Sequence, residues 1–342
     1  MTNKRTVPCL LLCLLLAVAM HAAAPRVVAI GDIHGDFDAF AGILQRAQLV
    51  DPGLRWAGGN AILVQTGDFL DRGPKARAVM DLLMSLQEGA PKQGGRVIVL
   101  MGNHEAMNIY GDLRYITDKD YASFADDGAG ARRNKVPTAR PPGFEERCSA
   151  FAADGRYGKW LRTLPAVTRI NDSVFLHGGI HPDLSALSIE KINETIATEI
   201  KAFDAYKQFM AGKKIAQPCD TLQERVAAAR MALEKAKGKE AETLKSFLEY
   251  DAWLSISENG PLWFRGYAQW TDAEGAPQIQ RLAEAFGVAR FVVGHTPQLP
   301  GSIVTRFGGK VYLIDTGMLS SFFPGGRATA LNIQDGKISF ID

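Results

Sequence analysis

Histidine and aspartate residues that could bind metal ions occur in several short, glycine-flanked segments of this sequence. The chain has six histidines, and one of them, His21, lies in the N-terminal leader described below. The other five are His34, His104, His177, His181 and His295. A single histidine in such a segment is more often an ordinary hydrogen-bonded residue. Five of them, together with Asp32, Asp68 and Asn103, favour a metal centre.

The types of these residues indicate which chemistry the centre would support. Imidazole and carboxylate ligands without thiolate suit Mn²⁺, Fe or Zn²⁺, and the candidate ligands outnumber what one ion needs. Two ions roughly 3.5 to 4 Å apart activate a bridging water as a nucleophile and stabilise an in-line displacement. Arg72 and Arg265 add planar cations that suit phosphate oxygens. Together these features predict phosphoester hydrolysis.

Buried strands are the elements that must position these residues. Apolar runs end directly before the polar segments, at residues 26–30, 61–65, 96–101, 173–176 and 290–293. Asp68 follows Asp32 by 36 positions and Asn103 follows Asp68 by 35, which fits a strand, a crossover helix and a return strand. Helical patterns at 37–49 and 76–86 provide these crossovers. The loops should therefore open on one edge of a parallel sheet, where α/β folds bind ligands.

The remaining pattern predicts one α/β domain over residues 25–342, built as two facing mixed β-sheets flanked by helices. A helix near residues 279–286 precedes a β-rich tail at 310–314, 328–333 and 337–341, with a hairpin turn at Asp335-Gly336. Two helical insertions are expected at about 106–165 and 187–254. We interpret the second insertion as ordinary cap helices, and the alternative is a surface that binds a partner.

The N-terminus predicts a secretory signal over residues 1–24. Lys4 and Arg5 precede an apolar stretch at 10–20 and the small residues Ala22 and Ala24. This stretch is shorter than the about 20 residues of a spanning helix, and an uncleaved anchor is the alternative. No later apolar run is long enough for a membrane helix. We therefore expect an exported protein, periplasmic or secreted, that is not inserted in the membrane after cleavage.

Charge and cysteine content further narrow the class of protein to which this chain can belong. The chain of 342 residues has a formal net charge of +2, and two of its basic residues lie in the leader. The mature chain is thus near neutral and lacks the basic excess of a nucleic-acid binder. Cys9 and Cys13 also lie in the leader, which leaves Cys148 and Cys219. In an exported protein these two predict one disulfide, with two buried free thiols as the alternative.

Five motifs follow one another along nearly the whole mature chain. They are Gly31-Asp32-x-His34-Gly35, Gly67-Asp68-x-x-Asp71-Arg72-Gly73, Gly102-Asn103-His104-Glu105, His177-Gly178-Gly179 and Gly294-His295-Thr296. Their order and separations resemble the phosphoprotein phosphatase branch of the calcineurin-like metallophosphoesterases. Each motif is modestly specific, but five in this order are very specific. The resemblance implies the calcineurin-like metallophosphoesterase fold with two divalent metal ions, Mn²⁺ expected and Fe or Zn²⁺ as alternatives.

The resemblance implies a role for each ligand. The implied metal ligands are Asp32, His34, Asp68, Asn103, His177 and His295. Asp32 and His34 would hold one ion, Asp68 would bridge both ions, and the other three would complete the second site. No such role is implied for Glu105 or His181, for which we expect structural or supporting contacts.

The resemblance also implies the acid and the phosphate-binding groups. His104 would protonate the leaving oxygen with the help of Asp71, while Arg72 and Arg265 would bind the phosphoryl group. Elementary chemistry agrees, because histidine is a natural general acid near pH 7 and a neighbouring carboxylate stabilises its charged form.

Two departures from related groups refine the resemblance. Purple acid phosphatases place a tyrosine ligand shortly after the Gly-Asp motif, whereas residues 69–72 are Phe-Leu-Asp-Arg. The C-terminal region has Asp315-Thr316-Gly317-Met318 where the eukaryotic serine/threonine enzymes have Ser-Ala-Pro-Asn-Tyr. Together with residues 260–266, this looks more like the Shewanella-like bacterial phosphatases, among which phosphotyrosine preference occurs.

Three hypotheses follow. The first is a metal-dependent phosphomonoesterase acting on phosphoprotein or a small phosphoester, with phosphotyrosine slightly favoured, in which a metal-bridging hydroxide attacks phosphorus. The second is hydrolysis of dinucleoside polyphosphates such as diadenosine tetraphosphate, against which export argues. The third is a non-catalytic binding module on an inactive scaffold, but none of the expected ligands is missing.

Overall fold

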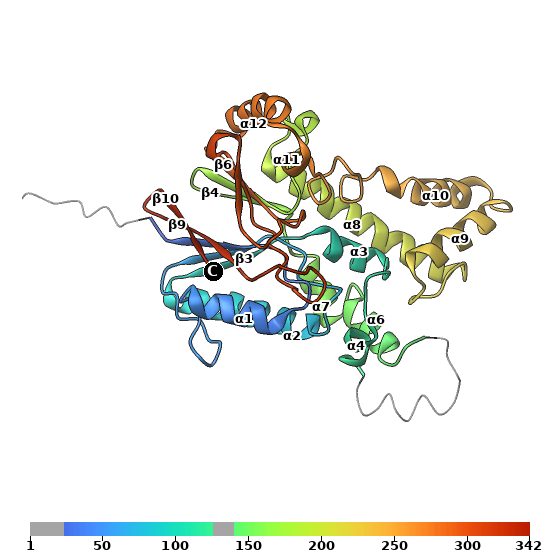
Figure 1. Ribbon diagram of the computed structural model, residues 1–342. Helices are drawn as coiled ribbons and strands as arrows, with labels where there is room; N and C mark the ends of the chain where they lie inside the picture. The colour runs from blue at the N-terminus through green and yellow to red at the C-terminus, as the bar shows by residue number, and fades with distance from the viewer. Residues whose placement is uncertain (1–23, 126–139) are drawn as a thin grey trace, which may run out of the picture.

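The computed structural model describes residues 24–125 and 140–342, and its strands form two five-stranded sheets (Figure 1). The strand order of the first sheet is β10-β9-β1-β2-β3. Its strands are β1 (Val27–Ile30), β2 (Ile62–Gln65), β3 (Arg96–Val99), β9 (Ala330–Gln334) and β10 (Lys337–Ile341). Strands β1, β2 and β3 are parallel, and β9 and β10 add an antiparallel hairpin. The predicted loops after β1, β2 and β3 therefore do share one edge.

The second sheet has the order β4-β5-β6-β8-β7. Its strands are β4 (Val167–Ile170), β5 (Ser173–Leu176), β6 (Arg290–Val293), β7 (Val304–Arg306) and β8 (Val311–Leu313). Strands β5, β6 and β8 are parallel, and β4 and β7 are antiparallel edge strands. The sequence pattern did not predict either edge strand. Both are short and carry polar residues, as edge strands commonly do.

Side chains that point between the two sheets form one hydrophobic cluster. Its buried members are Val27, Ala29, Ile62, Val64, Leu100, Ile170, Phe175, Val292, Tyr312, Ile314 and Leu331. Alternate residues of the same strands, such as Val28 and Ile30, belong instead to a larger cluster shared with the helices. Both faces of the central strands are thus buried, which explains why these strands are continuous apolar runs.

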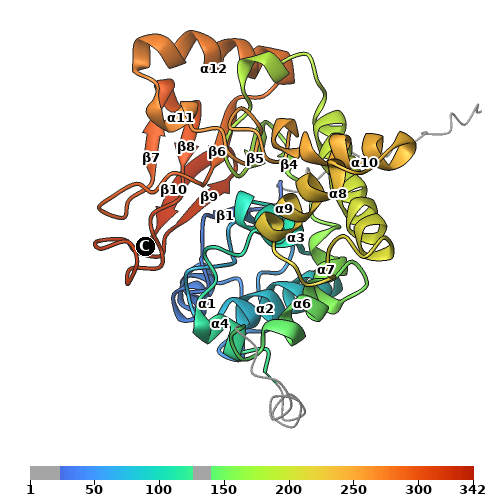
Figure 2. The same ribbon diagram turned by 90° about the vertical axis from the view of Figure 1, so that its right-hand side faces the viewer.

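Helices cover the outer faces of the sheets (Figures 1 and 2). The crossover helices α1 (Phe37–Arg46) and α2 (Ala76–Gly89) lie where the apolar periodicity predicts them. Helix α12 (Asp272–Phe286) lies beside the second sheet and begins seven residues earlier than the predicted 279. A capping box between Thr271 and Glu274 starts it there, ahead of the Pro277 that weakens the helical pattern.

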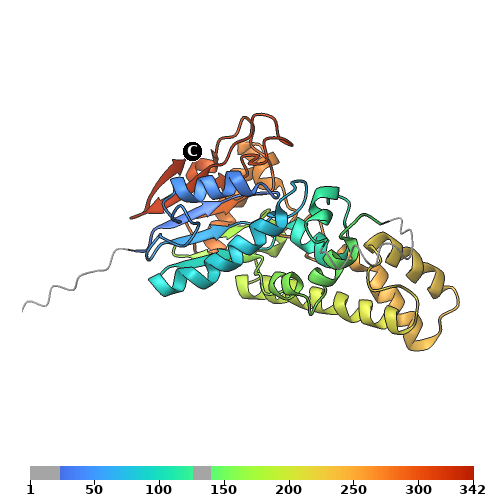
Figure 3. The same cartoon turned by 90° about the horizontal axis from the view of Figure 1, so that it is seen from below.

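The predicted insertions are helical, and the second extends to one side of the sheets (Figures 1 and 3). The first insertion comprises most of α3 (Asn103–Tyr110) with α4 (Asp118–Ala122), α6 (Phe144–Phe151) and α7 (Arg156–Leu161), and the second comprises α8 (Ile189–Gly212), α9 (Leu222–Leu233) and α10 (Gly238–Leu248). Helices α7 and α8 both contact α3. Short helical segments complete the fold: α11 (Gly266–Gln269) and the 3₁₀ turns Ala90–Gln93, Pro182–Leu184, Tyr250–Ala252 and Phe307–Gly309.

Two predicted segments lie outside the described residues. They are the leader, described only at Ala24, and the middle of the first insertion at 126–139. Within residues 24–125 and 140–342, no helix is long and apolar enough to span a membrane.

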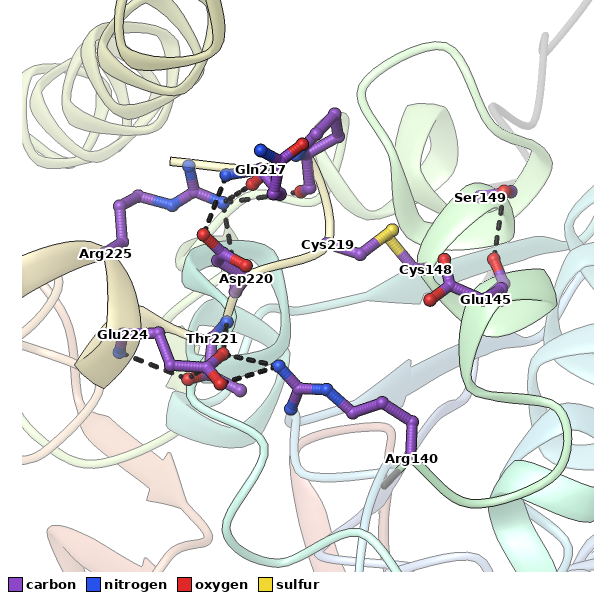
Figure 4. Close-up of a disulfide and its surroundings, with 11 residues drawn as sticks. Arg140, Glu145, Cys148, Ser149, Gln217, Cys219, Asp220, Thr221, Glu224 and Arg225 are labelled. Carbon is purple, nitrogen blue, oxygen red and sulfur yellow. Dashed lines mark hydrogen bonds and ion pairs between the residues drawn. A yellow bond between two sulfur atoms is a disulfide. The ribbon is translucent and has the colours of Figure 1, made fainter. Parts of the chain in front are cut away.

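A disulfide joins the two helical insertions (Figure 4). Cys148 lies on α6 and Cys219 lies between α8 and α9, with Cα atoms 5.8 Å apart. Beside this bond, Arg140 donates to both carboxylate oxygens of Glu224, at 2.7 and 2.6 Å. The bond expected from the cysteine count is therefore present in the structure.

We expect the disulfide to contribute strongly to stability. The bond closes a loop with a sequence separation of 71 residues. On the chain-entropy model, removing it lowers the free energy of unfolding by about 4 kcal/mol. Urea unfolding with and without dithiothreitol measures this difference, and a Cys148→Ala/Cys219→Ala variant should give the reduced value in both conditions. Equal stability of oxidised and reduced protein would contradict the expectation.

Candidate metal centre

Strand ends from both sheets bring the predicted ligands to one buried place. Asp32 and His34 follow β1, Asp68 follows β2, Asn103 begins α3 after β3, His177 follows β5, and His295 lies two residues after β6. The Oδ2 atom of Asp68 lies 3.3 Å from His177 Nε2, 3.8 Å from His34 Nε2 and 3.8 Å from His104 Nε2. All these side chains are buried. Asp68 is thus central, as a bridging ligand must be.

At one side of Asp68, three acceptor atoms face one another. His177 Nε2 lies 2.9 Å from Asn103 Oδ1 and 3.0 Å from His295 Nδ1. The other ring nitrogens are near backbone carbonyls, His177 Nδ1 at Thr66 (3.0 Å) and His295 Nε2 at Trp263 (2.9 Å), which can only accept. In neutral rings the protons therefore sit on those outer nitrogens, and the facing atoms carry lone pairs. A cation satisfies all three lone pairs at once, so these residues fit a metal ion.

His34 is prepared as a ligand in the same way on the other side of Asp68. Its Nδ1 donates to the carbonyl of Leu70 at 2.9 Å, which leaves Nε2 as an acceptor, 3.9 Å from Asp32 Oδ2. Burial, reinforced by nearby His104, holds the pKa of His34 well below its usual value. A neutral imidazole is the form that binds metals.

Asp32 is one of several carboxylates buried close together. Its Oδ1 accepts a hydrogen bond from the backbone N–H of His295 at 3.0 Å. Burial, together with Asp315 and Asp68, raises the pKa of Asp32 well above its usual value. Clustered buried carboxylates call for a positive charge between them. The geometry gives two triads whose ligand atoms lie within 4.8 Å of one another, His34–Asp68–His104 and Asp68–His177–His295.

His104 forms a hydrogen-bonded pair with Asp71 at the edge of the centre. Its Nδ1 lies 2.7 Å from Asp71 Oδ2. Burial lowers the pKa of His104, but Asp68 and Asp71 outweigh burial and leave the pKa raised. The geometry therefore offers His104 both the general-acid role and a place in the first triad. Its separation from the ligands stays a prediction.

The two predicted arginines lie beside the two sides of the centre. Nη1 of Arg72 is 2.5 Å from His34 Nε2, and its Nε is buried without a partner in the described part of the chain. Arg265 donates from Nη1 to the carbonyl of His295 at 2.8 Å and to Thr296 Oγ1 at 3.0 Å. Both guanidinium groups thus lie near ligands of the centre.

Several centre residues have left-handed backbone conformations. The φ angles are 48° at His34, 57° at Asp68, 66° at Asp71, 65° at Arg72 and 70° at His295. Such conformations are unfavourable for residues other than glycine, and they cluster at functional sites. Tertiary contacts must therefore hold these loops in place.

Glu105 supplies that hold through the kind of supporting contacts expected for it from the sequence. Its carboxylate accepts backbone N–H groups of Asp68, Phe69, Leu70 and Gly102 at 2.7, 3.1, 3.2 and 2.8 Å. Glu105 is the third residue of α3, and this position, where a glutamate caps a helix start, was the signal in the sequence.

Asp315 is a further residue that the sequence did not assign to the centre. It follows β8, is fully buried, and accepts the backbone N–H of Gly317 at 3.0 Å. Burial raises its pKa to about 6. Its position after another parallel strand was the available signal. His181, in contrast, packs against the ring of Phe264 at 5.0 Å and caps a 3₁₀ turn, so its role is structural, as expected.

Comparison with known proteins agrees with this geometry. Residues 25–299 match the calcineurin-like phosphoesterase family, so the chain belongs to this family and is a hydrolase of phosphoester bonds. Within the family it is similar to Shewanella-like protein phosphatase 1 of Plasmodium berghei, with 29% identity over 92% of this chain and 74% of the relative. An uncharacterised Schizosaccharomyces pombe protein is 34% identical, covering 93% and 80%.

A solved structure shows the same similarity. The cold-active protein-tyrosine phosphatase of a psychrophilic Shewanella species superposes with a TM-score of 0.62 and 26% identity, covering 93% of this chain and 81% of that one. The predicted family, fold and class of enzyme are therefore confirmed.

Two substitutions should separate ligand from acid. Asp68→Asn should lose bound metal together with activity, because Asp68 is shared by both triads. His104→Ala should keep its metal and lower kcat by about 10² to 10⁴-fold, the usual contribution of a general acid. Metal content after dialysis and steady-state kinetics measure both, with the exposed Asp154→Asn as control. Equal metal loss in the two variants would refute the separation.

Proposed function

We propose that this enzyme is a phosphomonoesterase with two metal ions that acts on phosphoprotein and favours phosphotyrosine. The centre supports two ions, and the Shewanella relative is titled a protein-tyrosine phosphatase. The observation that carries the preference is a group of aromatic side chains around Arg72, here called the aromatic rim. It consists of Tyr115, Phe322 and Phe323.

The chain's own residues would bind the phosphoryl group and protonate the leaving oxygen. When bound, the metal ions would supply Lewis acidity and an activated water. Arg72 has an unpartnered Nε–H within the described structure and, with Arg265, provides positive charge for the phosphoryl oxygens. His104, held by Asp71 through Nδ1, would donate a proton from Nε2 to the leaving oxygen. Burial of His104 and Asp71 lowers the local dielectric and strengthens the contact between them.

The aromatic rim lies where the leaving group would emerge. The Tyr115 ring is 5.0 Å from the His104 ring, and the Arg72 Cζ atom lies 5.6 Å from Tyr115 and 5.0 Å from Phe322. Tyr115 and Phe322 are 41% and 54% exposed. A leaving oxygen must approach His104, so the group attached to it lies beside Tyr115. The phenol ring of phosphotyrosine can pack there, whereas phosphothreonine offers only a methyl group.

Two further properties belong to this proposal. Mn²⁺ is the proposed metal, because nitrogen and oxygen donors without thiolate suit it, and Fe or Zn²⁺ are alternatives. Export is supported by the leader pattern of residues 1–24 and by the Cys148–Cys219 disulfide, since disulfides persist in oxidising compartments.

The substrate class can be tested directly with the mature chain beginning at Pro25. With Mn²⁺ present, kcat/KM should be higher for a phosphotyrosine peptide than for a phosphothreonine peptide of the same surrounding sequence. Diadenosine tetraphosphate is assayed alongside. Preference for the dinucleotide would overturn the proposed substrate class. If no substrate is turned over, the hypothesis of a non-catalytic binding module would be favoured instead.

The aromatic rim makes a separate prediction. Tyr115→Ala should lower the ratio of kcat/KM values for phosphotyrosine and phosphothreonine peptides by about fivefold, because one aromatic contact contributes about 1 kcal/mol beyond its buried area. Tyr115→Phe keeps the ring and should keep the ratio. Phe340→Ala, an exposed aromatic residue on β10, is the control for general effects. An unchanged ratio in Tyr115→Ala would show that the aromatic rim does not determine the preference for phosphotyrosine.

A further inference from the structure

The pair His104–Asp71 is extended by a buried amide. Asp71 Oδ1 accepts a hydrogen bond from Asn108 Nδ2 at 2.9 Å, while its Oδ2 is bonded to His104. Asn108 Nδ2 also donates to the carbonyl of His104 at 2.8 Å, one turn earlier on α3. The Asn108 amide group therefore faces Asp71 with its nitrogen, and its oxygen points the other way.

That oxygen receives a charged donor from the first insertion. Arg147 on α6 donates from Nη2 to Asn108 Oδ1 at 2.7 Å and from Nε to Asp120 Oδ2 on α4 at 3.0 Å. Arg147 is only 2% exposed, and Asp120 is fully buried. The Arg147 Cζ atom lies 4.1 Å from the Phe151 ring centre. A charged side chain is thus held deep in the protein, and it points along the amide toward the catalytic pair.

The arginine holds the far end of the amide, whose nitrogen is held by Asp71 and the His104 carbonyl. Arg147 can only donate, so Asn108 must present its oxygen to Arg147 and its nitrogen to Asp71. Without this donor, the Asn108 oxygen would be buried without a partner, and only the two bonds of its nitrogen, to Asp71 and to the His104 carbonyl, would hold the amide. The amide could then tilt, which would loosen its contact with Asp71 and, through Asp71, the orientation of His104.

We propose that Arg147 is a positioning residue for proton transfer to the leaving oxygen, acting through Asn108 and Asp71 on His104. The inference rests on the proposed role of His104 as general acid. A purely structural role is the competing explanation. A buried ion pair is weak evidence for stability, because apolar replacements of similar volume are often neutral.

The leaving group distinguishes positioning from structure. Phenyl phosphate and 4-nitrophenyl phosphate are similar in size, but nitrophenolate is a far better leaving group and needs little protonation. A displaced acid should therefore slow phenyl phosphate much more than nitrophenyl phosphate. Single-turnover rates of the metal-loaded enzyme isolate this step, and metal content is measured for every variant.

Arg147→Met/Asp120→Asn removes both charges, so that no buried charge is left unpaired. We expect at least a tenfold loss with phenyl phosphate, at most a threefold loss with nitrophenyl phosphate, and unchanged metal content. Asp120→Asn alone leaves Arg147 without its charged partner and should lower stability, but it keeps the contact between Arg147 and Asn108, so no selective loss with phenyl phosphate is expected. If the double variant does not fold, Asn108→Ala removes the link between Arg147 and Asp71 with the ion pair intact, and it should show the same selective loss.

His104→Ala separates failure of this inference from failure of the proposed function. It should itself show the selective loss with phenyl phosphate. If it does not, the general-acid assignment is wrong. If it does, while the Arg147 and Asn108 variants lose both substrates equally or neither, Arg147 does not position the acid and the inference is overturned.

Discussion

The structure depends on holding the Asp68 carboxylate and the lone pairs of neighbouring imidazoles close together in a buried site. Asp68 Oδ2 has three imidazoles within 3.8 Å, and two of the neighbouring ring nitrogens are only 3.0 Å apart. Without cations such a group would repel itself, so the surrounding fold must resist its expansion. The two sheets do so from opposite sides, because the ligands come from strand ends of both and a shared apolar core joins them.

Helix α3 connects this constraint to the rest of the chain. Its first residues are Asn103, His104 and Glu105, and all eight of its residues are buried. Glu105 binds the Asp68 loop, and the His104 backbone N–H donates to Asp68 Oδ1 at 2.9 Å, which leaves Oδ2 to face the centre. One helix start thereby fixes Asn103, the proposed acid His104 and the loop of Asp68. Complete burial of α3 requires the insertion helices α7 and α8, which pack against it.

Much of the fold and of the centre was predictable because its signals are local. A buried strand ending in a glycine-flanked polar segment is visible in sequence, so Asp32, Asp68 and Asn103 could be placed at one edge. Glu105 and Asp315 also had local signals, but their functions depend on partners more than 30 residues away. Strands β4 and β7 escaped prediction because short edge strands lack an apolar pattern. The orientation of Asn108 by Arg147 has no signal at all, since arginines in insertions are usually solvated.

The division of labour in the molecule follows from these contacts. The strand ends hold the ligands, and this part is set by the sheets. The proposed leaving-group side is built differently: Tyr115 and the Arg147–Asn108 contact come from the first insertion, which the disulfide ties to the second. Insertions can change without disturbing the sheets, whereas a predicted ligand residue cannot move unless the strand that positions it also moves. On the proposed function, substrate preference and acid positioning depend on the insertions, whereas the metal centre depends on the sheets.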